Sequence, residues 1–339
     1  MDLHATWFVL LGVLLAGYAI LDGFDLGVGI LHLSARGDEE RRIFLNAIGP
    51  IWDGNEVWLI TFGGALFAAF PEAYATVFSG FYLPFMLLLF ALIFRAVSIE
   101  FRSKLAPPAW RRFWDAAFSG ASLVPALLFG VAVGNALRGV PLDERGVFTG
   151  GLLDLLTPYP VLVGVTTVAM FAMHGALYLY LKVPHGPLHD RIRETMWHTW
   201  GVFLVLYILA TLATLTMVPR AVPRPTHAPW AALVVTVSVL AIANIPRAIY
   251  HGRAGQAFLS SCTAIAALVA LFSLALWPNL VTASNDPALS LTIYRAASSP
   301  KTLRIMFVIA CIGMPLVATY TTAVYWIFRR RVELGPGSY

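Results

Sequence analysis

Residues Gly49–Pro71, GPIWDGNEVWLITFGGALFAAFP, join a polar start to a long apolar run. Asp53 and Glu56 are three residues apart, so they share one face of a helix. In water, two carboxylates in a first turn simply suit the helix dipole. In a membrane, carboxylates at the start of an apolar helix need a partner or a function. The rest of the chain decides between these two settings.

The composition indicates a membrane protein. Of 339 residues, 59% are hydrophobic and 12% are charged, about half of the usual ~25% charged fraction. The apolar residues come in blocks of about 20, which is the length of a helix that crosses a bilayer. The basic residues lie in short loops, which is typical of an orientation signal and not of nucleic-acid binding. Cys262 and Cys311 lie in apolar runs, which excludes a disulfide framework or an iron–sulfur site.

The hydropathy pattern predicts an all-α polytopic membrane protein with nine transmembrane helices in a single domain, 1–339. The expected spans are 6–33, 50–71, 73–98, 115–136, 158–182, 198–219, 229–249, 258–278 and 303–328. We expect a first four-helix bundle over about 6–136, a second over about 158–278, and a ninth helix over 303–328.

The basic residues are distributed unevenly over the two predicted sides of the membrane. Sixteen of the 23, with Arg95 counted among them, fall after spans one, three, five and seven or in the C-terminal tail. The other side holds seven. Positive residues favour the cytoplasm, so we expect the N-terminus outside and the C-terminus inside. The helix 50–71 then begins at the cytoplasmic face.

The first span contains a second unusual stretch, GYAILDGFDLGVGILHL. Asp22 and Asp25 are three residues apart, and Gly29 and His32 continue the same stripe. Small residues on this face let another helix approach closely. Carboxylates inside a span are costly unless they face protein, water or a partner. Two interpretations remain open: a functional polar site, which we favour, or a packing face whose aspartates are satisfied by neighbouring polar groups.

Two further observations concern redox centres and the inner surface. His174 is the only histidine well inside a predicted span, and a lone buried histidine is more often a packing residue than a haem ligand. We therefore predict no metal site in this chain. Glu100 and Lys104 have i,i+4 spacing, and taken alone they are typical of an interfacial salt bridge of little energetic weight.

Several motifs together resemble subunit II of the cytochrome bd-type quinol oxidases. They are GYAILDGFDLGVG, ERR, GPIWDGNEVWLITFGGALFAAFPEAYA, FSGFYLPF, FRAVSIEFRSK and the Trp114-Asp115 pair. The match in order and spacing extends to about residue 135, and WDGNEVW is very specific. From about 140 to 330 the resemblance lies mainly in hydropathy, and the outer loops look closer to the cyanide-insensitive branch.

The resemblance implies a heterodimer in the bacterial cytoplasmic membrane. In this family, subunit I carries two b-type haems, a d-type haem and the quinol-oxidising loop. The complex reduces oxygen to water with electrons from quinol and takes up cytoplasmic protons. Subunit II stabilises the complex, ligates no haem, and in some members holds a structural quinone. Subunit I is thus the expected partner, with quinol as the substrate of the complex, membrane lipid around it, and a small accessory subunit as a further expected component.

The resemblance also implies a proton pathway. The family's residues correspond to Trp52, Asp53, Glu100, Lys104 and, more weakly, Tyr339. A second set of intramembrane polar residues, Asp22, Asp25 and Glu56, matches the family's motifs without a defined role.

Two alternatives to the proton-supplying subunit remain open. A transporter would use its intramembrane acids to bind a substrate or a coupling ion, and would more often show inverted repeats with broken helices. A purely structural subunit would use Asp53 only to begin a helix, which looks the same in sequence.

Overall fold

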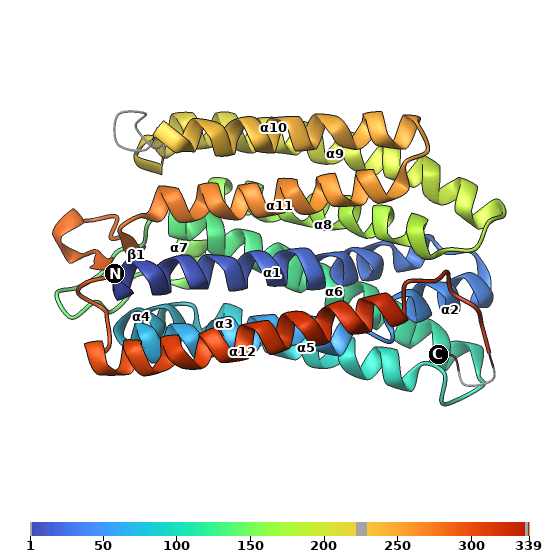
Figure 1. Cartoon of the computed structure of the whole chain (residues 1–339), viewed down its shortest axis with the longest axis horizontal. Helices are drawn as coiled ribbons and strands as arrows, with labels where there is room; N and C mark the ends of the chain where they lie inside the picture. Colours follow the sequence, from blue (N-terminus) through green and yellow to red (C-terminus); the bar gives the residue numbers. More distant parts are fainter. Residues whose placement is uncertain (1, 222–228, 336–337, 339) are drawn as a thin grey trace.

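The computed structural model describes residues 2–221, 229–335 and 338. Long helices run side by side along one axis (Figure 1). The helices are α1 (Leu3–Leu31), α2 (Gly37–Ile48), α3 (Trp52–Ala69), α4 (Pro71–Gly80), α5 (Tyr82–Phe101), α6 (Pro108–Arg138), α7 (Leu152–Leu155), α8 (Pro158–Lys182), α9 (Pro187–Met217), α10 (Pro229–Tyr250), α11 (Ala254–Leu276) and α12 (Pro300–Ile327). The short elements are η1 (His32–Ser34), η2 (Pro219–Ala221), η3 (Pro287–Leu289), β1 (Asn279–Val281) and β2 (Leu291–Thr292), and β1 pairs with β2 in antiparallel fashion.

Local sequence signals explain where these helices begin. Proline occupies the first turn of α4, α6, α8, α9 and α12, where its missing N–H has no intrahelical partner to lose. The Asp2 carboxylate accepts hydrogen bonds from the first backbone amides of α1, and the Ser299 hydroxyl accepts one in α12. Both residues are favourable N-caps.

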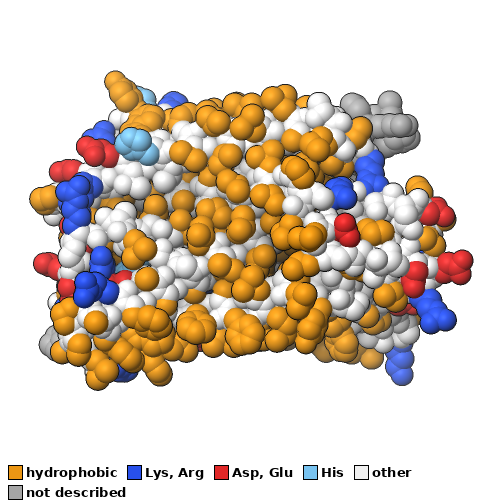
Figure 2. Space-filling model, turned by 180° about the vertical axis from the view of Figure 1, so that it is seen from behind, with side chains coloured by type: hydrophobic (Ala, Val, Ile, Leu, Met, Phe, Trp, Pro, Cys, Tyr) orange, Lys and Arg blue, Asp and Glu red, His pale blue; other side chains and the backbone are white. Residues whose placement is uncertain are grey.

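The fold class is confirmed, whereas the predicted count of nine spans is not. Within the described ranges, eight helices are long and apolar enough to cross a membrane: α1 with η1, α5, α6, α8, α9, α10, α11 and α12. Figure 2 shows hydrophobic side chains over the middle of one face and charged ones at both ends. The helix missing from this set is α3, an 18-residue helix whose polar first turn lowers its mean hydropathy. The division into two four-helix bundles stays a prediction.

The predicted boundaries differ from the structure where hydropathy and helix geometry diverge. The expected span 73–98 is broken at Phe81 into α4 and α5, and α4 alone is too short to cross a bilayer. Helix α6 begins seven residues before its predicted span, and helix α9 begins eleven residues before its own. In both cases a proline begins the helix in a polar segment that precedes the apolar run.

Helix α1 lies at the centre and packs against α3, α6, α8 and α11. Its glycines allow this. A methyl group on Gly27 would lie 1.9 Å from the Phe171 carbonyl oxygen of α8, and one on Gly29 would lie 1.9 Å from Ser122 Oγ of α6. The predicted close-approach face of the first span is therefore confirmed.

The alternation of the helices places the segments rich in Lys and Arg at one end. This end contains η1, α2, the start of α3, the end of α5 and the starts of α6 and α9 (Figure 1). We call it the cation-rich end. Arg95 is one of the sixteen basic residues that the sequence assigns to this side of the membrane. In the structure it lies inside α5 and is only 1% exposed. That assignment was wrong, because a buried guanidinium inside an apolar helix does not report on the surface.

Candidate functional site

Three neighbouring helices bring five polar side chains together in the interior. They are Asp22 and Asp25 of α1, Asn55 and Glu56 of α3, and Arg95 of α5. We call them the buried charge cluster. All but Glu56 are at most 2% exposed. Charged groups at such depth require partners.

Arg95 links three helices through its guanidinium. Its Nη1 donates to Asp22 Oδ2 at 3.0 Å, and its Nη2 donates to Asp22 Oδ1. The same Nη2 lies 2.8 Å from Glu56 Oε1. The paired bonds to Asp22 are the two-pronged geometry that an arginine fork makes with a carboxylate. Helices α1, α3 and α5 are therefore held together by one buried cation.

Asn55 connects the second aspartate to the last helix. Its Nδ2 donates to Asp25 Oδ2 at 2.7 Å, and the Tyr325 hydroxyl of α12 donates to Asn55 Oδ1 at 2.9 Å. The other carboxylate oxygen, Asp25 Oδ1, is buried without a hydrogen-bond partner among the described residues. A buried acceptor without a partner is costly, so this oxygen is open to a hydrogen bond from water.

The cluster lies nearer to the cation-rich end than to the other end. Asn55 and Glu56 occupy the first turns of α3, and Arg95 is six residues before the end of α5. At 1.5 Å per residue these positions are roughly 5–10 Å from the helix ends. A short path of polar groups can therefore join the surface to this cluster.

A groove next to the cluster contains Asp53. The groove has a volume of about 290 Å³ and lies between α1, α12 and the first turns of α3. Its lining residues include Asp53, Asn55, Trp58, Tyr320 and Tyr325. The Asp53 side chain is exposed. Trp52 is 9% exposed and packs in the apolar core of this end. Asp53 and Glu56 therefore have different surroundings: Asp53 lines the groove, whereas Glu56 forms an ion pair with Arg95.

The remaining residues of the predicted pathway are not brought together with the cluster. Glu100 lies exposed in the last turn of α5, and Lys104 follows after the helix has ended at Phe101. Both are at the cation-rich end. Tyr339 lies outside the described residues.

A second polar assembly surrounds Asp115 of α6 at the cation-rich end. Its carboxylate accepts hydrogen bonds from His32 Nε2 at 2.7 Å, Arg41 Nη1 at 2.8 Å and Arg102 Nε at 2.5 Å. Arg102 also donates to Asp38 of α2 at 2.8 Å. This Asp115 network joins η1, α2, α6 and the segment after α5, and so ties these segments together at the cation-rich end.

Asp115→Asn is expected to lower the free energy of unfolding by about 2–3 kcal/mol, because it removes the charge that three donors share. The measurement is thermal unfolding of the membrane-extracted complex. Asp190→Asn, an exposed carboxylate in the first turn of α9, is the control and is expected to change stability by less than about 0.5 kcal/mol. Equal stabilities of the two variants would contradict the proposed role of the network.

His174, inside α8, does not fit the axial ligation of a haem. His174 has both ring nitrogens engaged, with Ser261 Oγ at 2.7 Å and the Ile20 carbonyl oxygen at 3.0 Å. His32 is bonded to Asp115 through Nε2, and its Nδ1 has no hydrogen-bond partner among the described residues. In the described part of the chain no group of three or more His, Cys, Asp or Glu side chains could hold a metal ion. His174 is thus the hydrogen-bonded packing residue that its sequence context favours.

Sequence reasoning missed the partners that make these sites. Arg95, Asn55 and Arg102 were not selected as site residues, although FALIFRAVSIEF places a lone arginine within an apolar run. That pattern alone marks an intramembrane ion pair. The partners of Arg102 could not be found in this way, since they come from segments 13 and 64 residues away.

Comparisons with known proteins agree with the family resemblance of the sequence motifs. The model of a family described as cytochrome bd terminal oxidase subunit II matches residues 3–328. The chain is 39% identical to the cytochrome bd-I ubiquinol oxidase subunit 2 of Escherichia coli K12, over 96% of this chain and 93% of that protein. It is 34% identical to the cytochrome bd ubiquinol oxidase subunit 2 of Bacillus subtilis, over 98% and 97%. In fold it is similar to a chain of the bd oxidase structure from Geobacillus thermodenitrificans, with a TM-score of 0.78 at 17% identity, covering 97% of this chain and 99% of that one.

Proposed function

The chain belongs to the family of cytochrome bd terminal oxidase subunits II, and from this premise we propose that it is subunit II of a bacterial quinol:oxygen oxidoreductase. In this role it ligates no haem, stabilises the haem-bearing subunit I and helps to supply cytoplasmic protons. Bound haem in the complex supplies the chemistry of oxygen reduction. What supports the proposal is the polar connection from the Asp53 groove to the buried charge cluster.

The proposal includes a membrane orientation. The cation-rich end faces the cytoplasm, since positive residues are retained there. The N-terminus then lies outside and the C-terminus inside. Helix α3 is the span that raises the total from eight to nine: it packs along α1, and its polar first turn lies at the cytoplasmic surface.

Protons enter this route at Asp53. Reduction of one oxygen molecule to water consumes four protons, and hydrocarbon does not conduct them. Asp53 is exposed in a groove that Asn55 and Tyr325 also line. A proton taken from the surface by Asp53 passes along groove water to the free oxygen of Asp25, which Asn55 holds in position. Trp52 packs behind the groove and keeps α3 in place.

The buried charge cluster forms the inner end of the route. Three carboxylates, those of Asp22, Asp25 and Glu56, face the single cation Arg95. Because the carboxylates outnumber the cation, the cluster has acceptors that can take up and release protons. Glu56 is 22% exposed. It is therefore the member of the cluster from which the proton route continues out of this chain toward a partner. Glu100 and Lys104 belong to the proposed proton pathway and lie at its cytoplasmic surface.

Asp53→Asn is expected to slow oxygen consumption roughly tenfold with excess quinol, equivalent to about 1.4 kcal/mol in the barrier. Asparagine keeps the size of the side chain but cannot carry the proton. The assembled complex and its haem content are expected to stay normal. The measurements are oxygen uptake by the purified complex and its reduced-minus-oxidised visible spectrum.

The control for this experiment is Glu72→Gln, an exposed carboxylate in the first turn of α4 at the opposite end. It is expected to leave turnover unchanged. Wild-type turnover in Asp53→Asn would remove Asp53 from the route. Loss of haem in that variant would instead favour a purely structural subunit, and a purified chain without any haem-bearing companion would favour a transporter.

A further inference from the structure

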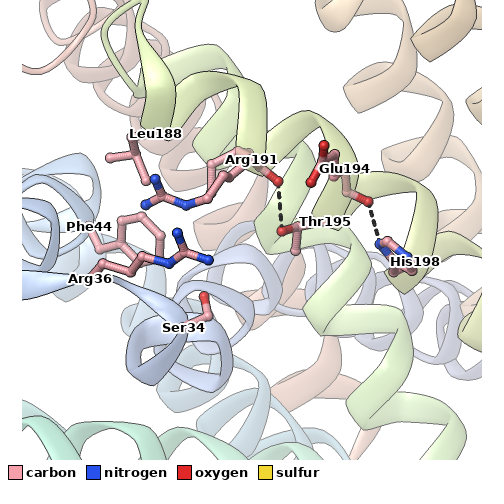
Figure 3. A pocket seen from close by; sticks show the side chains of 9 residues that line it. Ser34, Arg36, Phe44, Leu188, Arg191, Glu194, Thr195 and His198 are labelled. Atoms are coloured by element: carbon pink, nitrogen blue, oxygen red, sulfur yellow. Dashed lines mark hydrogen bonds between the residues drawn. The ribbon is translucent and has the colours of Figure 1, made fainter.

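A polar cavity at the cation-rich end lies apart from the groove. It has a volume of about 220 Å³ and opens between η1, the start of α2 and the first three turns of α9 (Figure 3). The side chains that line it are Ser34, Arg36, Phe44, Leu188, Arg191, Ile192, Glu194, Thr195 and His198.

Two guanidinium groups point into this cavity from opposite walls. Figure 3 shows the side chains of Arg36 and Arg191 approaching one another across it, with Glu194 on the far side. Arg191 Nη2 donates to both Glu40 oxygens, at 2.5 and 2.6 Å. The Arg36 guanidinium has no hydrogen bond or ion pair among the described residues; only its backbone N–H is bonded, to Glu40. The cavity therefore offers an unneutralised cation and the spare N–H donors of a second one.

The length of α9 places the cavity at the depth of lipid headgroups. From Trp200 to Met217 the helix carries no charged residue. These 18 residues span roughly 27 Å, close to the ~30 Å of the hydrocarbon core. Arg191, Thr195 and His198 precede this stretch, so they lie beyond the hydrocarbon on the same side. Trp197, 39% exposed, lies at the boundary where tryptophan is enriched.

An apolar stripe continues from the cavity along the same face of α9. Arg191, Thr195 and His198 are followed at spacings of three and four by Val202, Val205 and Leu209, which keeps them on one side of the helix. The last three are 47–58% exposed. A free anion would use only the arginines, whereas a phospholipid would use the arginines and the stripe together.

We propose that this cavity binds the phosphate of an anionic phospholipid such as phosphatidylglycerol, with its acyl chains along the α9 stripe. Arg36 and Arg191 hold the phosphate oxygens, in the way that basic pockets between transmembrane helices hold lipid headgroups. Glu194 and the Thr195 hydroxyl oxygen, which follow Arg191 on α9, accept hydrogen bonds from headgroup hydroxyls. The site is independent of the proton route and is not needed for it.

The test measures lipid retention by the intact, delipidated oxidase complex in native mass spectrometry after addition of phosphatidylglycerol. Arg36→Gln is the main variant, because Arg36 has no side-chain partner whose loss would disturb the fold. It is expected to weaken phosphatidylglycerol binding roughly tenfold. Arg193→Gln, an exposed arginine two residues from Arg191, is the matched control and is expected to bind like the wild type.

Three outcomes would overturn the proposal. They are equal retention of phosphatidylglycerol in both variants, equal retention of zwitterionic phosphatidylethanolamine by the wild type, and displacement of the lipid by inorganic phosphate at comparable concentration. The last would identify a site for a free anion. Because binding is measured without turnover, a failure here leaves the Asp53 route untouched, and a failure of that route leaves this result untouched.

Discussion

Arg95→Met is expected to prevent accumulation of the assembled complex. Arg95 is buried, is the only cation bonded to Asp22 within residues 2–221, 229–335 and 338, and also pairs with Glu56. Its removal leaves two carboxylates in the membrane interior without their counter-charge. Removing one partner of a buried ion pair costs about 3–5 kcal/mol, a large part of the ~5–15 kcal/mol that stabilises a typical protein. The measurements are the yield of haem-containing complex and its thermal unfolding temperature.

Two companion variants separate charge from geometry. Arg95→Lys keeps the charge but loses the planar fork, so it is expected to be intermediate in yield. The double variant Arg95→Met with Asp22→Asn removes the strongest unpaired charge and is expected to recover part of the yield. An unfolding temperature of Arg95→Met equal to that of the wild type would show that Arg95 does not hold α1, α3 and α5 together.

The same arginine shows what a single sequence can and cannot predict. Hydropathy identified long helices well: the expected span 158–182 coincides with α8. Hydropathy is a local average, however. It contains no information on the ion pair between Glu56 and Arg95 that holds α3, whose first turn is polar. The break at Phe81 was missed because apolar residues continue across it.

The candidate site was predicted in its carboxylates but not in its connections. Asp22, Asp25, Asp53 and Glu56 stand out because acidic residues in apolar runs are rare. Asn55 does not stand out, since a polar residue near a helix start is common. Its importance comes from Asp25, 30 positions earlier, and from Tyr325, 270 positions later. Such contacts follow from the packing of α1, α3 and α12, which no local pattern specifies.

The packing of α1 on α8 leads to the second large expected effect. Gly27→Ala is expected to prevent stable folding. Its added methyl group would lie 1.9 Å from the Phe171 carbonyl oxygen and 2.8 Å from the Gly175 backbone nitrogen. Both are backbone atoms and cannot rotate away, so the two helices must separate. Overpacking by one methyl group typically costs about 1–3 kcal/mol, and a backbone clash at the central helix lies at or above that range.

The matched control for this prediction is Gly201→Ala in α9, where an added methyl group meets nothing within 4 Å. Alanine is the better helix former by about 1 kcal/mol, so this variant is expected to be as stable as the wild type or slightly more so. Gly175→Ala is the reciprocal test, because its methyl group would lie 2.4 Å from the Gly27 carbonyl carbon. Thermal unfolding and yield of the complex are the measurements. Wild-type stability of Gly27→Ala and Gly175→Ala together would show that α1 and α8 can move apart without loss. In that case the positions of Asp22 and Asp25, which α1 carries, would have to be fixed by Arg95, Asn55 and the packing of α1 on α3, α6 and α11.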